Sequence, residues 1–283
     1  MDLRELKQLF SENNFRPNKR LGQNFLVDKN IRDKILSALP LDEDGIAVEV
    51  GSGFGVMTFA LAKKCKKVIA IEKDIKICRI MRTFFEKEDN IELVNEDILN
   101  VDLCDLPEQK GSILIFGNIP YYISTPFIEK IIENKNCIKT AYIVIQKEVA
   151  DRIVALPGSK TYSSLSCFVQ YFTKVKKLFR VKKNSFYPKP RVESALLGIE
   201  TLSSPSVKVK DEALMFRMIR KAFSQRRKKA VNPLSDTGFI GLEKERWERL
   251  FEECGLSPSL RAEDISLSDY ARLADAVNKT LRP

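Results

Sequence analysis

The chain has 283 residues, of which 44% are hydrophobic, and this is enough to bury the core of one large or two ordinary domains. It contains no histidine, which excludes Ser-His-Asp and Cys-His catalysis and removes the commonest zinc ligand. The formal net charge is +10, which indicates an acidic partner such as nucleic acid.

The cysteines and the apolar runs indicate where the protein works. The six cysteines include no C-x-x-C pair and follow no secretory leader, so we expect reduced thiols and a cytoplasmic location. No apolar run approaches the roughly 18 residues of a membrane span. We therefore expect neither a metal site nor membrane association.

In chain order, helix and strand patterns alternate from residue 28 to about residue 156. A basic arm extends to about residue 27, and a helix with Asp28 as its N-cap is expected at 28–39. Strands are expected at 46–50, 67–72, 91–95, 112–116 and 140–146, with helices near 56–65, 74–87, 125–134 and 147–156. Strands separated by helices need crossover connections, so the pattern predicts an α/β, Rossmann-like domain with a mainly parallel, doubly wound sheet.

The last third of the chain has a different pattern. Strands at 175–182 and 192–200 are expected to be antiparallel at one edge of the sheet. Residues 201–213 are rich in Ser, Pro and Lys and indicate a linker, beyond which the pattern is helical. Amphipathic helices are expected near 211–224, 243–254 and 267–279. We therefore divide the chain into an α/β domain at 1–203, which includes the basic arm, and a small all-α domain at 204–283.

A glycine loop follows the first predicted strand, in the sequence EVGSGFGVMT. Gly51, Gly53 and Gly55 let the backbone turn tightly and approach a ligand closely. Alone this is a weak signal, and the dinucleotide fingerprint requires a small residue where this chain has Val56. That departure argues against a pyrophosphate site.

Two carboxylates follow the next two strands at the same edge of the sheet. Glu72 closes the strand at 67–72, where a carboxylate can accept from both ribose hydroxyls of a nucleoside. Asp97 follows the strand at 91–95, where it can accept from an adenine amine. Either residue alone could simply cap the helix that follows it. Together with the glycine loop they predict an adenosine ligand without phosphates, which indicates S-adenosylmethionine rather than NAD.

The sequence GNIPY ends the fourth strand at this edge. The side-chain oxygen of Asn118 and the backbone carbonyl of Ile119 can accept from the two N–H groups of an aromatic amine, which makes its lone pair available for methyl transfer. Pro120 fixes the turn, and Tyr121 offers a face on which a base can stack. An N-x-P-Y sequence could be an ordinary turn. Its place after this strand favours an amine-methylating site that needs neither metal nor histidine.

Three segments are strongly basic. Residues 174–191 hold eight Lys and Arg residues, no Asp or Glu, and several interleaved aromatic residues, and a second basic block lies at 225–229. We expect both to track a phosphate backbone. The third segment, at 63–67, lies at a predicted helix end and is better explained as solvated surface.

Several longer motifs together resemble the ribosomal RNA adenine dimethyltransferase family, and within it most of all the small-subunit branch, the KsgA type. The resemblance covers about residues 16 to 280. It rests on NKRLGQNFLVD at 18–28, EVGSGFGVMT, IEKD at 71–74, NEDIL, GNIPYYISTP, QKEVADRIVA at 146–155, SFYPKPRVESALL at 185–197 and AFSQRRKKAVNPL at 222–234. The C-terminal motifs resemble the small-subunit branch more than the large-subunit methylases that share most of the other motifs.

The resemblance implies roles for individual residues. The positions that match S-adenosylmethionine-binding residues of the family are Asn24, Leu26, Gly51, Glu72, Asp97 and Asn118. Asn118 also matches the residue that reaches the target amine, and Tyr121 and Phe186 match two aromatic residues that sandwich a flipped adenine. These three are therefore the predicted catalytic residues.

The resemblance also implies an activity and a partner. The activity is conversion of two adjacent adenosines near the 3′ end of small-subunit (16S) rRNA to 6,6-dimethyladenosine, with S-adenosylmethionine as methyl donor and no metal. The partner is this rRNA within the assembling small ribosomal subunit, late in its biogenesis, and we expect a monomer.

Three alternatives stay open at the level of the sequence. A nicotinamide-dependent or other nucleotide-dependent enzyme is opposed by Val56 and by the GNIPY corner. A non-catalytic RNA-binding assembly or transcription factor would be indicated by loss of that corner or of Glu72, and both are intact. A DNA adenine methylase differs only in its substrate.

Overall fold

The computed structural model describes residues 1–106, 113–236 and 238–281. Contacts divide the chain into two compact units, Met1–Ala150 with Lys174–Ser203, and Asp151–Thr173 with Ser204–Pro283. The sequence predicted a single division at residue 203, with residues 151–173 in the first domain. These residues group with the second unit because Cys167 and Tyr171 belong to the same buried cluster as Trp247.

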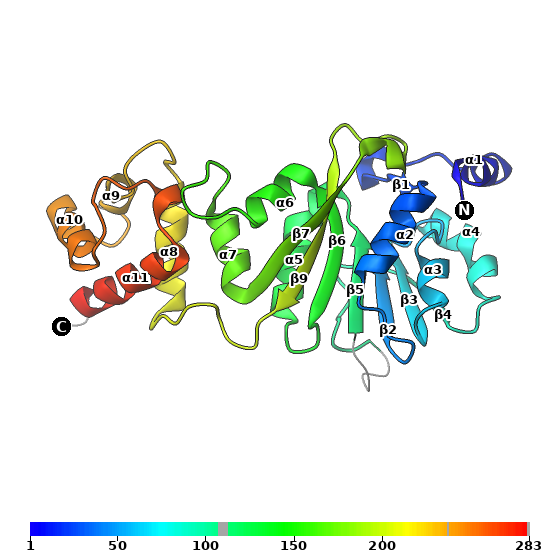
Figure 1. Ribbon diagram of the computed structural model, residues 1–283, viewed down its shortest axis with the longest axis horizontal. Coiled ribbons are helices and arrows are strands. Elements are labelled where there is room, and N and C mark those ends of the chain that lie inside the picture. Colours follow the sequence, from blue (N-terminus) through cyan, green and yellow to red (C-terminus); the bar gives the residue numbers. More distant parts are fainter. Residues whose placement is uncertain (107–112, 237, 282–283) are drawn as a thin grey trace. The chain divides into compact units, whose positions relative to one another are not determined.

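A seven-stranded sheet forms the centre of the first unit (Figure 1). Its strands are β2 (Ile46–Val50), β3 (Lys67–Glu72), β4 (Ile91–Asn95), β5 (Ile113–Asn118), β6 (Thr140–Gln146), β7 (Thr173–Val181) and β9 (Ser194–Thr201). They lie in the order β4-β3-β2-β5-β6-β9-β7. Ser112, with which the sequence prediction began the fourth strand, lies outside the described residues.

The pairing of these strands confirms the predicted mainly parallel, doubly wound sheet. β2 pairs in parallel with β3 and β5, β3 with β4, and β5 with β6. β9 pairs antiparallel with β6, at the side of the sheet where β7 is the last strand. All five residues of β2 are buried, as expected for a central strand covered on both faces.

Helices cover both faces of the sheet in the first unit (Figure 1). The helices of the chain are α1 (Leu3–Glu12), α2 (Lys29–Ala38), α3 (Thr58–Ala62), α4 (Ile75–Phe85), α5 (Ser124–Glu133), α6 (Lys147–Ile153), α7 (Ser164–Phe172), α8 (Glu212–Phe223), α9 (Val231–Leu234), α10 (Lys244–Glu253) and α11 (Leu267–Leu281). Ile35 of α2 and Leu61 of α3 pack in one cluster with Phe116 of β5, and α5 lies on the opposite face. Asp28 caps α2 as predicted, since its side chain accepts from the backbone N–H of Ile31 at 3.2 Å.

The N-terminal segment is more ordered than a basic arm. Residues 3–12 form α1, which begins with a capping box between Asp2 and Glu5 and buries Leu6 and Phe10. The D-x-x-E spacing and the apolar periodicity were the signals for this helix, and the sequence prediction did not use them. The short strand β1 (Phe25–Leu26) then pairs antiparallel with β8 (Phe186–Tyr187) in a separate two-stranded sheet.

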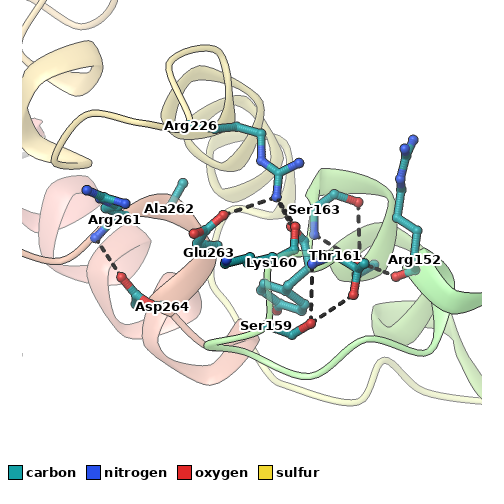
Figure 2. Close-up of polar contacts among 12 residues, drawn as sticks. Arg152, Ser159, Lys160, Thr161, Ser163, Arg226, Arg261, Ala262, Glu263 and Asp264 are labelled. Atoms are coloured by element: carbon teal, nitrogen blue, oxygen red, sulfur yellow. Dashed lines mark hydrogen bonds and ion pairs between the residues drawn. The ribbon is translucent and has the colours of Figure 1, made fainter.

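The second unit is helical and has a core of its own. Trp247 of α10, Tyr270 of α11 and Met218 of α8 are fully buried in one cluster. A polar network joins three segments of this unit (Figure 2): the guanidinium of Arg226 donates to the carbonyl oxygens of Lys160 at 2.7 Å and Tyr162 at 3.0 Å, and lies 3.0 Å from the carboxylate of Glu263. Arg226 belongs to the predicted RNA-binding block at 225–229, yet its guanidinium is used inside the fold.

The structure corrects the prediction of six reduced cysteines. Cys104 and Cys137 form a disulfide, with their Cα atoms 5.5 Å apart. Cys65, Cys78 and Cys167 are free and buried, and Cys254, also free, is half-buried. The prediction was wrong for the bonded pair because the two residues are 33 positions apart, and only the folded chain brings the segment after β4 beside the end of α5.

The described residues lack two features, a helix that could span a membrane and a group that could hold a metal ion. None of their helices combines the length and the apolar character that crossing a bilayer requires. Nor do they contain a group of three or more His, Cys, Asp and Glu side chains placed to hold a metal ion.

Candidate active site

A cavity lies in the first unit at the carboxyl ends of the parallel strands, where open α/β sheets bind ligands. It is lined by the glycine loop after β2, the ends of β3 and β5, the segment before α2, and β8. The predicted site residues that line it are Asn24, Leu26, Gly51, Glu72, Asp97, Asn118, Tyr121 and Phe186. The fold thus brings together all eight, although they come from six separate parts of the sequence.

The glycine loop presents backbone rather than side chains to the cavity. Gly51 and Gly53 have positive φ angles of 71° and 53°, which L side chains rarely adopt. A Cβ atom on Gly53 would lie 3.1 Å from the ring of Phe25, so the loop also has no room for a larger residue there. The N–H of Gly51 donates to the carbonyl of Ile71 at 2.8 Å, which fastens the loop to the end of β3.

Glu72 is buried at the floor of the cavity. One carboxylate oxygen accepts from the N–H of Gly53 at 3.0 Å, and the other accepts from the N–H of Asp74 at 2.8 Å. Burial raises the pKa of this carboxyl, and the two backbone hydrogen bonds oppose that rise. The alternative role as a helix cap does not apply, because Asp74 is the N-cap of α4. Glu72 instead holds the glycine loop, which leaves its remaining lone pairs for a ligand.

Asp97 follows β4, the edge strand that pairs with β3. Its carboxylate accepts from the Lys73 ammonium at 2.6 Å and from the N–H of Leu99 at 3.1 Å. Burial alone would raise the pKa of Asp97, but these hydrogen bonds and the charge of Lys73 lower it below its ordinary value. The Leu99 contact stabilises a turn, and no helix follows Asp97 in the described residues before β5, so the alternative role as a helix cap does not apply there.

Two further cavity residues were given no role from the sequence. Glu49, at the end of β2, is 3% exposed, accepts from the Thr58 hydroxyl at 2.6 Å, and forms no ion pair within the described part of the chain. Burial raises its pKa to about 8. The Ser52 hydroxyl is also buried and has no hydrogen-bond partner among the described residues. The sequence feature that could have indicated a role for Glu49 is a carboxylate one residue before the end of the strand that precedes the glycine loop.

The GNIPY corner faces the same cavity. The side-chain N–H of Asn118 donates to the carbonyl of Asn24 at 2.9 Å, which fixes the amide and leaves its oxygen as a free acceptor. The N–H of Ile119 donates to the carbonyl of Val144 at 3.0 Å, so the corner is also tied to β6. Pro120 has a φ of −53° and its carbonyl accepts from Ile123 at 3.0 Å. The turn is therefore held at both ends.

The two predicted stacking residues both line the cavity. Tyr121 is half-buried, and its hydroxyl lies 3.1 Å from the hydroxyl of Ser194, which fixes the ring. Burial raises the pKa of Tyr121, with the Ser194 hydrogen bond acting in the opposite direction. Phe186 is 5% exposed and packs in a core cluster with Leu26. Phe186 thus has a structural role besides any contact with a base.

Comparison with known proteins decides the family. Residues 14–279 match the family model described as ribosomal RNA adenine dimethylase. The chain belongs to this family. It is 37% identical over 284 residues to "Ribosomal RNA small subunit methyltransferase A" of Clostridium perfringens, covering 99% of both chains. The protein of the same name from Clostridium botulinum is 36% identical, and the match covers 96% of this chain and 98% of that protein.

Solved structures agree with this dimethylase fold. A dimethyladenosine transferase from Plasmodium falciparum has a TM-score of 0.77 at 26% identity, covering 90% of this chain and 98% of that one. The 23S rRNA methyltransferase ErmE has a TM-score of 0.70 at 23% identity, covering 90% of this chain and all of the other, and this shows the fold alone. The resemblance found in the motifs, and the methyltransferase fold that it implied, are confirmed.

The basic segments of this dimethylase divide into cations that are used within the fold and cations that are free. In the segment 174–191, Arg180 pairs with Glu193, and Lys174 lies 3.6 Å from Glu200. Besides Lys176, the exposed cations of this segment that form no ion pair within the described residues are Lys182, Lys183, Lys189 and Arg191. These four flank Phe186 on both sides in the sequence, so free positive charge surrounds the strand that carries Phe186 into the cavity.

Proposed function

We propose that this chain dimethylates the 6-amino groups of two adjacent adenosines near the 3′ end of small-subunit rRNA, with S-adenosylmethionine as methyl donor. Membership of the dimethylase family supports the reaction, and the names of the Clostridium relatives support the small subunit. The observation that carries the proposal is the placement of the GNIPY corner on the same cavity as the glycine loop and three strand-end carboxylates.

The residues of the cavity fit S-adenosylmethionine. Glu72 would accept from the ribose hydroxyls, and Asp97 would accept from the adenine amine. Glu49 has no cationic partner among the described residues, and it would pair with the ammonium group of the methionine moiety. The unpartnered hydroxyl of Ser52 supplies a further polar contact in the same wall. When bound, the group supplies an activated methyl on a sulfonium, so no metal or imidazole has to activate the donor.

The acceptor side of the cavity suits an exocyclic amine. The lone pair of an adenine amine is delocalised into the ring, and the amine becomes a nucleophile as it turns pyramidal. The side-chain oxygen of Asn118 and the carbonyl of Ile119 would accept from its two N–H groups and stabilise the positive charge that develops. Tyr121 and Phe186 would hold the ring of a base that has left its stack.

The substrate would approach over the basic surface of the first unit. Lys182, Lys183, Lys189 and Arg191 would contact phosphates around the mouth of the cavity. In the second unit, Arg227, Lys228 and Lys229 are exposed and would contribute further phosphate contacts, which makes this helical unit an RNA-binding domain. We propose that the protein acts as a monomer in the cytoplasm, on the assembling small subunit late in its biogenesis.

One experiment tests the reaction and the substrate together. The protein is incubated with methyl-labelled S-adenosylmethionine and, in separate reactions, with unmethylated small subunits, large subunits or DNA. The modified nucleosides are then identified by mass spectrometry. We expect label in 6,6-dimethyladenosine of the small subunit alone. Label in the large subunit or in DNA would replace the proposed substrate, and no label in any reaction would refute methyl transfer.

A further inference from the structure

A second hollow in the first unit lies beside α1, outside the cavity described above. We call it the α1 groove, and the residues that line it include Lys7, Phe10, Asn14, Phe15, Arg16 and Tyr187. Its volume is about 360 Å³, within the range of sites for small organic ligands. None of the residues that line it is acidic, and two of them are cations. The proposed function assigns no work to this groove.

The floor of the groove is fixed by aromatic packing. Phe10 lies 5.1 Å from Phe54 and 5.0 Å from Phe15, measured between ring centroids, and all three rings are buried. Asn14 has a φ of 46°, and the N–H of Phe15 returns to the carbonyl of Phe10 at 2.8 Å. The chain therefore reverses sharply after α1 and brings Arg16 to the same hollow as Lys7. Buried aromatic packing and a backbone hydrogen bond thus fix the backbone next to the two cations.

Tyr187 forms the aromatic wall of the groove. Its ring centroid lies 6.1 Å from that of Phe10, and the Lys7 ammonium lies 5.3 Å from it. Tyr187 is only half-buried, so part of the residue is accessible to a ligand. Neither Lys7 nor Arg16 forms an ion pair within the described residues, so no carboxylate neutralises either charge there. A partly exposed aromatic ring that shares a groove with two cations is a pattern that binds a base and its phosphate.

The position of Tyr187 connects the groove with the acceptor site. Tyr187 follows Phe186 on β8, and successive side chains of a strand point to opposite faces. Phe186 lines the proposed catalytic cavity, whereas Tyr187 lines the α1 groove. The strand β8 is thus a shared wall, with one aromatic ring on each side. If one base of the RNA lies against Phe186, the adjacent nucleotide of the RNA would lie close to Tyr187.

We propose that the α1 groove binds a nucleotide of the RNA next to the adenosine being methylated. The base stacks on Tyr187, and Lys7 and Arg16 contact the adjoining phosphates. This inference rests on the proposed function, because it names a further contact of the same substrate. It gives α1 a role in substrate recognition, and it predicts that the groove affects RNA handling without affecting the binding of S-adenosylmethionine.

The stacking contact is tested with Tyr187→Leu and Tyr187→Phe, and Phe84→Leu is the matched control. Phe84 is an exposed aromatic residue with a lysine ammonium, that of Lys87, 6.0 Å from its ring, but it lines no part of the groove. We expect Tyr187→Leu to lower kcat/KM for unmethylated small subunits roughly 5- to 150-fold, with unchanged affinity for S-adenosylmethionine. Tyr187→Phe and Phe84→Leu should match the unaltered protein.

The phosphate contacts are tested through salt dependence. Replacing Lys7 and Arg16 together by Gln should reduce the slope of log affinity for the subunit against log salt by about 0.7 to 0.9 per charge. The double control Lys64→Gln with Lys87→Gln, which removes two exposed charges elsewhere, should leave the slope unchanged.

Two outcomes would overturn the inference. One is an unaltered kcat/KM in Tyr187→Leu. The other is an equal fall of kcat/KM in Tyr187→Phe, because the base is proposed to stack on the ring, which that variant keeps. An unchanged salt slope in the Lys7 and Arg16 variant would remove the phosphate contacts. If the unaltered protein fails to methylate small subunits, the proposed function itself has failed, so the two failures are distinguishable.

Discussion

The two sides of the proposed catalytic cavity differ in charge. The side proposed for the methyl donor carries three carboxylates, those of Glu49, Glu72 and Asp97. The acceptor side is formed by the uncharged groups of Asn118, Ile119, Tyr121 and Phe186. Carboxylates suit a donor that is permanently cationic at sulfur. Neutral acceptors suit an amine that is uncharged in the ground state and becomes positive only during transfer. The amide and carbonyl oxygens do not take up a proton before the reaction, and they stabilise the positive charge as it develops.

Burial has different consequences on the two sides. Glu49 and Glu72 are almost fully buried and their pKa values are raised, so each would gain from a ligand that favours its charged form. On the proposed acceptor side, Asn118 carries no charge that burial could disfavour, and its amide is fixed by a neutral hydrogen bond to the Asn24 carbonyl. Substitutions on the first side should therefore change donor binding, and substitutions on the second side should change the methyl-transfer step.

The largest effect is expected for Asn118→Ala. It removes an acceptor for the target amine, and we expect the single-turnover rate of methyl transfer to fall by at least about 100- to 1000-fold. The affinity for S-adenosylmethionine, measured by calorimetry, should change much less. Full turnover by this variant would refute the mechanism. A loss of donor affinity as large as the loss of rate would show that Asn118 acts mainly in binding the donor, and not in the methyl-transfer step.

Glu72→Gln should give the opposite pattern. Glutamine keeps the shape but loses the charge-assisted acceptor, whose hydrogen bonds are typically worth about 1.5 to 3 kcal/mol. We expect the dissociation constant for S-adenosylmethionine to rise by roughly 10- to 150-fold. At saturating donor, the single-turnover rate should stay close to that of the unaltered protein. A rate defect that saturation does not correct would place Glu72 on the acceptor side.

Tyr121→Leu should weaken the handling of the base. Stacking of a base on an aromatic side chain is worth about 1 to 3 kcal/mol, so kcat/KM for small subunits should fall by roughly 5- to 150-fold. Tyr121→Phe keeps the ring and loses only the contact with the Ser194 hydroxyl, so it should retain most of the activity. Equal losses in the two variants would assign the effect to the hydroxyl and not to stacking.

The smallest effect is a pH dependence that originates on the donor side. The pKa of Glu49 is raised to about 8 in the folded protein, so its carboxyl is mostly protonated at pH 7. Pairing with an ammonium group requires the charged form, and donor binding should therefore release a proton below pH 8. From a pKa near 8 we expect the donor affinity to rise about fivefold between pH 7 and pH 8 and to level off above it.

Calorimetry in buffers of different ionisation enthalpy would measure this proton release directly. The matched variant Glu49→Gln should bind more weakly and release no proton on binding. The same shift in Glu49 has a sign for stability in the absence of a ligand: stability is full below the unfolded pKa of about 4.5 and declines as pH rises towards 8. An affinity that falls with pH in this range would refute the assignment of Glu49.

Local patterns in the sequence determined most of the sheet and most of the site. The five parallel strands are short apolar runs, and Asp28 begins its helix through contacts within one turn. Glu72, Asp97 and Asn118 could be placed together because parallel strands bring their carboxyl ends to one edge, whatever the loops do. The family followed from motifs that are themselves local.

The tertiary structure decided what depends on distant partners. Cys104 pairs with Cys137, and Arg226 is used inside the second unit, through residues far apart in the sequence. Glu49 is buried without an ion pair in the described part of the chain, and only the folded structure shows this. The same holds for Tyr187, which lies next to Phe186 in the sequence but on the other side of β8. A sequence shows which residues carry charge or a ring. Only packing shows which of them are already occupied, because contacts and desolvation are properties of the folded chain.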